Sequence, residues 1–120
     1  MNGDEVLLVL TNLPDRESAQ RIAISLVDNH TAACVNILES CTSIYRWQGK
    51  IESASEVPLL IKTTRAAYPL VEELIQSMHP YELPEIIAVS SASGLPAYLQ
   101  WVVKEVSSAN LPLTTTAMKE

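Results

Sequence analysis

Apolar residues recur along the chain in two spacings, which predict alternating strands and helices. Residues 5–11 form a short apolar run followed by a turn-like segment at 12–15, as expected of a buried strand. Asp15 is a suitable N-cap for a helix that ends near His30. The apolar residues of this helix fall at i, i+3, i+4, i+7 and i+8 and therefore share one face: Ala19, Ile22, Ala23, Leu26 and Val27.

The second half of the chain continues the alternation. A helix is predicted within residues 64–78, and Pro80 ends it. Because proline is tolerated only in the first turn of a helix, Pro69 indicates that this helix starts late. A strand is expected at 86–91. After Gly94, a last amphipathic helix is expected from the apolar residues Leu95, Tyr98, Leu99, Val102 and Val106.

Residues 33–63 predict two long strands joined at 48–50, where Gly49 supplies the positive φ of a tight hairpin. A straight first strand of about fifteen residues extends roughly 50 Å. A domain of this size has a diameter of only about 35 Å. We therefore expect a second copy of the chain to cover the tip of this ribbon. The alternative is a bend near residues 39–40 that folds the ribbon back on its own sheet.

The tip of the ribbon carries residue types that are typical of contact hot spots. We expect the subunit interface to include Ile44, Tyr45, Arg46 and Trp47. The alternative is that the aromatic rings stack on a small aromatic ligand.

The order of elements predicts an α+β fold. Its pattern, β-α-β-β-α-β plus a C-terminal helix, corresponds to a ferredoxin-like split βαβ sandwich with helices on one face of the sheet. The first strand is apolar at successive positions, as expected when both sheet faces are buried. A partner subunit is therefore expected on the other face. We expect a single domain over residues 1–109 and a flexible, polar tail over 110–120.

The charge balance narrows the possible partners. The net charge is −6, with 8 basic and 14 acidic residues and no cluster of Lys or Arg. This excludes a basic nucleic-acid-binding face and favours metal cations over anions. The apolar run at 6–10 is too short for a signal peptide or a membrane span, so a cytoplasmic location without a membrane partner is expected. Cys34 and Cys41 lie about 23 Å apart on a straight strand and on opposite faces, which predicts two reduced thiols.

Residues 79–85 contain the densest group of candidate functional side chains, held between two prolines. His79 is a suitable ligand for Cu or Zn, and Glu82 and Glu85 could assist it. The alternative is that His79 caps the C-terminus of the preceding helix as a cation. Lys62 lies among apolar residues and needs a partner, for which Glu85 and Glu56 are candidates. The pair is either structural or part of an anion pocket.

The sequence contains no motif of a known catalytic class. It has no GxSxG, HExxH, P-loop or GxGxxG motif, and only 3 glycines. No spacing of Ser, His and Asp predicts a nucleophile with its base. We therefore expect a protein that is not an enzyme.

Five sequence blocks resemble the signature blocks of the divalent-cation tolerance proteins called CutA (CutA1). These blocks lie at residues 32–37, 43–50, 60–63, 79–85 and 98–101, in the family's order. The resemblance implies a ferredoxin-like subunit and a tight homotrimer built by the long hairpins, similar in architecture to the PII signalling proteins. It also implies a role in tolerance of copper and other divalent metals, with no assigned catalytic reaction.

The chain departs from the family pattern where copper ligands are proposed in some bacterial members. Thr11 and Met78 occupy the positions of a cysteine and a second histidine, so only His79 carries over. The resemblance therefore implies weak binding of Cu(II) or another divalent cation, with no cofactor required. Residues 39–40 are Glu-Ser where Pro-Gly is commoner, which predicts a milder bend in the ribbon.

Two other functions compete with metal tolerance. One is a PII-like sensor that binds small molecules in clefts between subunits, at a site that includes Lys62, Tyr81, Glu85 and Trp47. The other is a trimeric scaffold for protein interactions.

Overall fold

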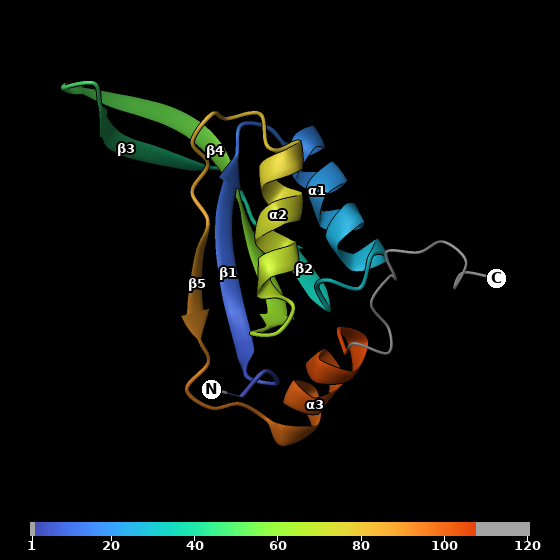
Figure 1. Ribbon diagram of the computed structural model, residues 1–120. Helices are drawn as coiled ribbons and strands as arrows, with labels where there is room; N and C mark the ends of the chain where they lie inside the picture. Colours follow the sequence, from blue (N-terminus) through green and yellow to red (C-terminus); the bar gives the residue numbers. More distant parts are fainter. Residues whose placement is uncertain (1, 108–120) are drawn as a thin grey trace.

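The computed structural model describes residues 2–107 (Figure 1). In chain order the elements are β1 (Val6–Leu13), α1 (Arg16–Asp28), β2 (Cys34–Ile37), β3 (Cys41–Trp47), β4 (Lys50–Thr64), α2 (Tyr68–Met78), β5 (Ile87–Ser90) and α3 (Pro96–Glu105). The predicted tail at 110–120 lies outside the described residues. Among the helices of residues 2–107, none has the length and apolar character needed to cross a membrane.

The strands form one antiparallel sheet with the order β2-β4-β1-β5, and β3 pairs with the other half of β4. Helix α1 therefore connects two strands, β1 and β2, that have β4 between them. Helix α2 likewise connects β4 and β5, which have β1 between them. The predicted α+β class is confirmed, and the order of elements differs from the predicted one only in the first ribbon strand, which is divided into β2 and β3.

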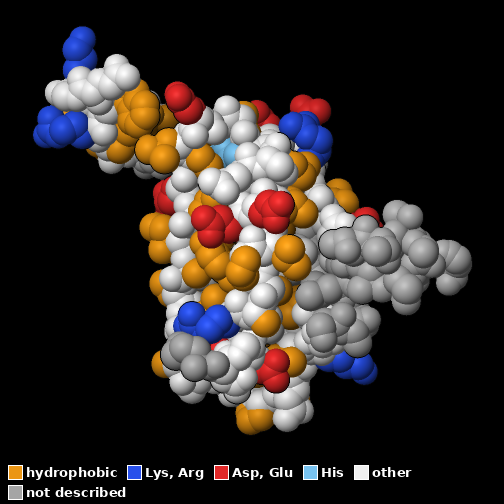
Figure 2. Space-filling model, viewed as in Figure 1, with side chains coloured by type: hydrophobic (Ala, Val, Ile, Leu, Met, Phe, Trp, Pro, Cys, Tyr) orange, Lys and Arg blue, Asp and Glu red, His pale blue; other side chains and the backbone are white. Residues whose placement is uncertain are grey.

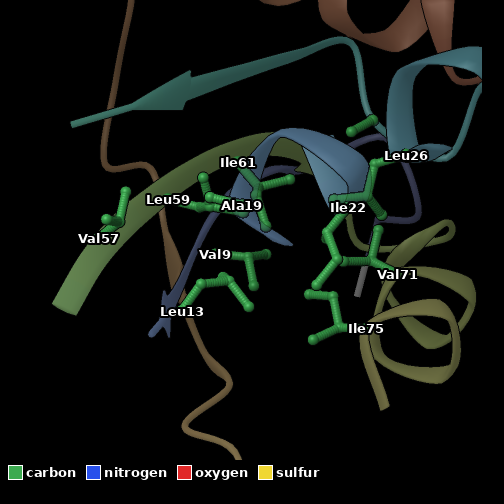
Figure 3. Close-up of a cluster of buried hydrophobic side chains, with 11 residues drawn as sticks. Val9, Leu13, Ala19, Ile22, Leu26, Val57, Leu59, Ile61, Val71 and Ile75 are labelled. Atoms are coloured by element: carbon green, nitrogen blue, oxygen red, sulfur yellow. The ribbon is translucent and has the colours of Figure 1, made fainter. Parts of the chain in front are cut away.

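The larger core cluster lies between one face of this sheet and the helices α1 and α2, and a smaller one packs Val102 of α3 with Val6 of β1. Within residues 7–13 of β1 and 57–63 of β4 the buried residues are two positions apart, so they project from the same face. Val27 was expected on the buried face of α1, but its side chain is 42% exposed because it lies at the edge of the stripe that packs on the sheet. Figure 3 shows the interdigitating side chains Val9, Leu13, Ala19, Ile22, Leu26, Val57, Leu59, Ile61, Val71 and Ile75.

The helix boundaries follow from local chemistry. Asp15 is the N-cap of α1, and its carboxylate accepts the Ser18 backbone N–H at 2.7 Å. This hydrogen bond lowers the pKa of the Asp15 carboxyl. The helix ends at Asp28, slightly before the expected end, and His30 adopts a φ of 60°. Helix α2 starts at Tyr68 with Pro69 in its first turn, which confirms the late start.

The prediction of one straight first strand in the ribbon is wrong, because β2 and β3 are separated at residues 38–40. Ile37 lies opposite Leu59 and Cys41 lies opposite Glu56. The three residues 38–40 therefore lie opposite only two residues of β4. The one additional residue makes this a β-bulge. The continuous strand β4 spans 15 residues.

The bulge also overturns the prediction that the two cysteines lie on opposite faces. Cys34 is opposite Lys62, and Cys41 is opposite Glu56. These two partners are an even number of residues apart on continuous β4, so they share a face. Since directly paired residues point to the same side, both cysteines lie on that face too.

We call β3 and the paired half of β4 the arm (residues 41–56). Its turn has positive φ at Gln48 (52°) and Gly49 (83°), as a two-residue hairpin requires, and this confirms the predicted turn. The arm projects from the body in Figure 1. The radius of gyration is 15.4 Å, against about 13.6 Å for a compact chain of this length. The alternative that the ribbon folds back on its own sheet is therefore wrong.

Two completely buried threonines differ in their hydrogen bonding. The Thr63 hydroxyl donates to the Thr31 carbonyl at 2.6 Å. The Thr11 hydroxyl lies in the core without a hydrogen-bond partner among the described residues. Burying an unpaired hydroxyl costs free energy, whereas a paired one contributes to stability.

We expect Thr11→Val to leave the free energy of unfolding unchanged or to raise it by up to about 1 kcal/mol, because a methyl group replaces an unpaired hydroxyl. Thr63→Val is the matched control. It should lower the free energy of unfolding by about 1–3 kcal/mol, because the Thr31 carbonyl loses its donor. Urea unfolding measures the free energy of unfolding of both variants. Equal losses of stability in the two variants would contradict the assignment of Thr11 as unpaired and Thr63 as paired.

Candidate functional site

A cavity of about 590 Å³ lies where the arm leaves the body. One wall comes from β3 and β4, and the other comes from residues 80–85, which follow α2. We call it the arm cavity. Its lining residues are Ser43, Ile44, Tyr45, Trp47, Glu56, Pro80, Tyr81, Glu82, Leu83 and Glu85.

His79 anchors the segment that forms the second wall. The Tyr81 backbone N–H donates to Nδ1 of His79 at 3.1 Å, so Nδ1 must be unprotonated. Nε2 then carries the proton and donates it to the Asn12 carbonyl at 2.7 Å. Both ring nitrogens are engaged, and the ring ties residues 79–81 to the end of β1.

Burial lowers the pKa of this ring. The His79 side chain is buried, which lowers its pKa, although the Asn12 hydrogen bond and the Glu56 charge oppose the shift. At the helix end it is the His79 backbone N–H that binds the Ile75 carbonyl. The alternative reading is therefore right about the position, because His79 is the C-cap of α2, but the cap is made by the backbone N–H and the ring is turned toward β1.

Tyr81 joins the two walls of the cavity. Its hydroxyl donates to Oε2 of Glu56 at 2.8 Å, and its ring lies 4.8 Å from the His79 ring between centroids. Burial and the hydrogen bond to Glu56 raise the pKa of Tyr81 to about 12. The phenol thus remains a hydrogen-bond donor at neutral pH and holds the Glu56 carboxylate at the cavity wall.

The predicted metal ligands are distributed over this region without forming a compact group. Glu82 and Glu85 line the arm cavity, and the Glu85 carboxylate accepts the Asn12 side-chain amide at 3.2 Å. His79 lies behind Tyr81 with both nitrogens engaged. Within residues 2–107, no three His, Cys, Asp or Glu side chains are grouped to hold a metal ion. Metal binding by these residues stays a prediction.

The proposed small-molecule cleft is assembled in part. Tyr81, Glu85 and Trp47 line the arm cavity together, but Lys62 is not among its lining residues.

Lys62 pairs within the sheet instead. Its ammonium donates to the Asn36 side-chain carbonyl and lies 3.9 Å from the Cys34 sulfur. The expected partners Glu56 and Glu85 accept hydrogen bonds from Tyr81 and Asn12, so that pairing prediction is wrong. The physical reason is the extended strand, which separates positions 56 and 62 by about 20 Å.

The four residues predicted for a subunit interface all lie on the arm. Tyr45 and Trp47 share the ribbon face that turns toward the arm cavity, and their side chains are 44% and 46% exposed. Arg46 projects from the other ribbon face. Ile44 alternates to that side as well, remains 73% exposed, and reaches the rim of the cavity.

Sequence reasoning treated Glu56 only as a partner for Lys62 and did not place it in the candidate site. It is the buried carboxylate of the arm cavity, 8% exposed. A signal existed, because Glu56 precedes the apolar run 57–61, where a carboxylate requires a hydrogen-bond partner.

Comparisons with known proteins agree with this fold. The chain matches the family model described as CutA1 divalent ion tolerance protein over residues 7–105. Divalent-cation tolerance protein CutA of Thermus thermophilus is 46% identical over 95 residues, which cover 79% of this chain and 92% of that protein. The crystal structure of CutA from Xylella fastidiosa has a TM-score of 0.84 at 44% identity, covering 86% of this chain and 99% of that one.

Several eukaryotic relatives are longer than this chain. Protein CutA of Homo sapiens is 42% identical over 101 residues, which cover 84% of this chain but 56% of the human protein. The names of relatives place them in different compartments. An Arabidopsis thaliana relative is named chloroplastic, and one from Archaeoglobus fulgidus is named periplasmic.

We expect Tyr81 to ionise near pH 12, whereas a free tyrosine ionises near pH 10. Phenolate absorbance should show this late component in the wild type and lose it in Tyr81→Phe. Tyr98→Phe is the control and should retain it. Glu56→Gln removes the neighbouring charge but keeps an acceptor, so the midpoint should move down toward pH 10. Burial and Glu72 also raise the pKa of Tyr68, so Tyr68→Phe is measured as well. A component near pH 12 that disappears in Tyr68→Phe but survives Tyr81→Phe, with the fold verified by circular dichroism, would contradict the assignment.

Proposed function

Because the chain belongs to the CutA1 divalent ion tolerance family, we propose that it acts in tolerance of divalent metal ions as a homotrimer without enzymatic activity. The observation that carries this proposal is the family match over residues 7–105. Relatives are named as tolerance proteins. We also propose that the subunit is ferredoxin-like and PII-like, which the split strand-helix-strand connections support.

The part of the sheet face opposite α1 and α2 that lies beyond Val6 supports the homotrimer. The helices α1 and α2 pack on one face, whereas Ile87 and Val89 on the opposite face are 51% and 45% exposed. These two residues pair with Leu10 and Leu8, so they continue one apolar surface across the strands. Such a surface is typical of an interface between subunits. Its members are Leu8, Leu10, Leu60, Ile87 and Val89.

The arm supports the same assembly. Ile44 and Ile51 lie on the ribbon face opposite Tyr45 and are 73% and 70% exposed. An isolated hairpin is only marginally stable in water. Figure 2 shows hydrophobic side chains along the arm and basic ones at its tip. We propose that this face of the arm packs on a neighbouring subunit.

We expect the wild-type chain to sediment at micromolar concentration as one species of about three times its mass of 13.2 kDa. Ile87→Asp should dissociate it, because burying an unpaired carboxylate in an apolar interface is strongly unfavourable. Ile24→Asp is the matched control, since Ile24 lies on α1 and is 68% exposed. Sedimentation velocity measures the oligomeric state of both variants. A stable, folded wild-type monomer would refute the proposed assembly.

We propose that the protein binds Cu(II) or another divalent cation weakly and requires no cofactor. The carboxylates of Glu82 and Glu85 face the cavity and suit such cations. His79 can join as a ligand only by giving up the hydrogen bond from the Tyr81 backbone N–H. We further propose a cytoplasmic location, which the free thiols of Cys34 and Cys41 support.

Calorimetric titration with Cu(II) near neutral pH tests the metal role. The double variant Glu82→Gln with Glu85→Gln should weaken binding at least threefold, because two oxygen ligands lose their charge. His79→Gln should change affinity less than twofold, and His30→Gln is its matched control. Loss of binding in His79→Gln alone would show that the histidine is the main ligand. Absence of Cu(II) binding in the wild type would contradict the proposed metal role.

A further inference from the structure

The arm cavity combines aromatic rings with carboxylates. Tyr45, Trp47 and Tyr81 supply three rings, and Glu56, Glu82 and Glu85 supply three carboxylates, while no Lys, Arg or His is among the lining residues. We infer that this cavity binds a small organic cation, a protonated or quaternary amine carried on an apolar frame. This inference uses the same cation-attracting end of the molecule as the proposed metal role but requires no metal.

The charge of the wall selects the sign of the ligand. Three carboxylates without a basic neighbour in the lining attract cations and repel anions. Glu56 and Glu85 each accept one side-chain hydrogen bond, from Tyr81 and Asn12 respectively. A carboxylate has about four lone-pair sites, so each retains acceptor capacity for an ammonium N–H.

The aromatic rings select the kind of cation. Tyr45 and Trp47 are two residues apart on β3, so both project from the ribbon face that lines the cavity. Tyr81 belongs to the opposite wall, where His79 and Glu56 hold its backbone and hydroxyl. Ring faces attract organic cations through their negative quadrupole. Two walls of rings can therefore receive one cation between them.

The dimensions distinguish this ligand from a metal ion and from a neutral molecule. A divalent metal requires several oxygens within about 2.6 Å of one point. The carboxylates do not form such a group in the described chain, so the metal binding proposed above is weak, whereas an organic cation does not need this grouping. A volume of about 590 Å³ falls in the usual range for small-molecule pockets. A neutral aromatic ligand would displace water from the carboxylates without replacing its hydrogen bonds, which is unfavourable.

Benzylammonium and its neutral isostere benzyl alcohol provide a direct test on the full chain at pH 7. The variant Trp101→Phe leaves Trp47 as the single tryptophan, so its fluorescence reports on the cavity. We expect benzylammonium to bind at least tenfold more tightly than the alcohol, and added salt to weaken its binding. Glu56→Gln, which keeps an acceptor for Tyr81, should weaken benzylammonium at least fivefold. Phenylacetate, an anion of similar shape, should not bind.

Calorimetry completes the test with two variants. Trp47→Ala should lose benzylammonium binding, whereas the control Trp101→Ala should retain it. Trp47→Ala should leave Cu(II) binding unchanged. Equal affinity for benzylammonium and benzyl alcohol would overturn the inference, as would absence of binding, including absence because a neighbouring chain fills the cavity. Since Cu(II) titration of the same samples reports separately on the metal role, either proposal can fail alone.

Discussion

The pairing of β4 along its whole length is the interaction on which the rest of this structure depends. Over residues 57–64 the strand is paired with β1 on one side, and β2 pairs with its other side over 59–62. Over residues 50–56 it is paired only with β3. The same strand therefore forms the centre of the body and the outer half of the arm. Because β4 continues without interruption, the orientation of the arm is fixed by the sheet.

The arm cavity exists because a second segment is tied to this strand. His79 binds the carbonyl of Asn12 at the end of β1, and Tyr81 binds Glu56 of β4. These contacts hold residues 80–85 opposite the arm. The histidine that was predicted as a metal ligand therefore also positions one wall of the arm cavity. Most of the polar and aromatic side chains that line this cavity are rings and carboxylates.

The two faces of the arm are suited to different tasks. Tyr45 and Trp47 turn toward the arm cavity, while Ile51 remains 70% exposed on the other face. Strand periodicity makes this division possible, since successive side chains alternate between faces. The proposed ligand site and the proposed subunit contact thus use opposite faces of one ribbon. Assembly and binding would then be linked through the same backbone.

Residue patterns alone determined the helices and strands, the Asp15 N-cap and the turn at Gly49, because these features depend on neighbours within a few positions. The bulge at 38–40 could not be predicted in this way. An added residue moves the following side chains to the other face of the ribbon, and only the pairing register with β4 shows that it is there. Only the tertiary structure decided the partners of His79 and Lys62. His79 meets Asn12, 67 residues away in the chain, and Lys62 meets Asn36 across the sheet. Such contacts depend on how distant segments pack, and no local spacing encodes them.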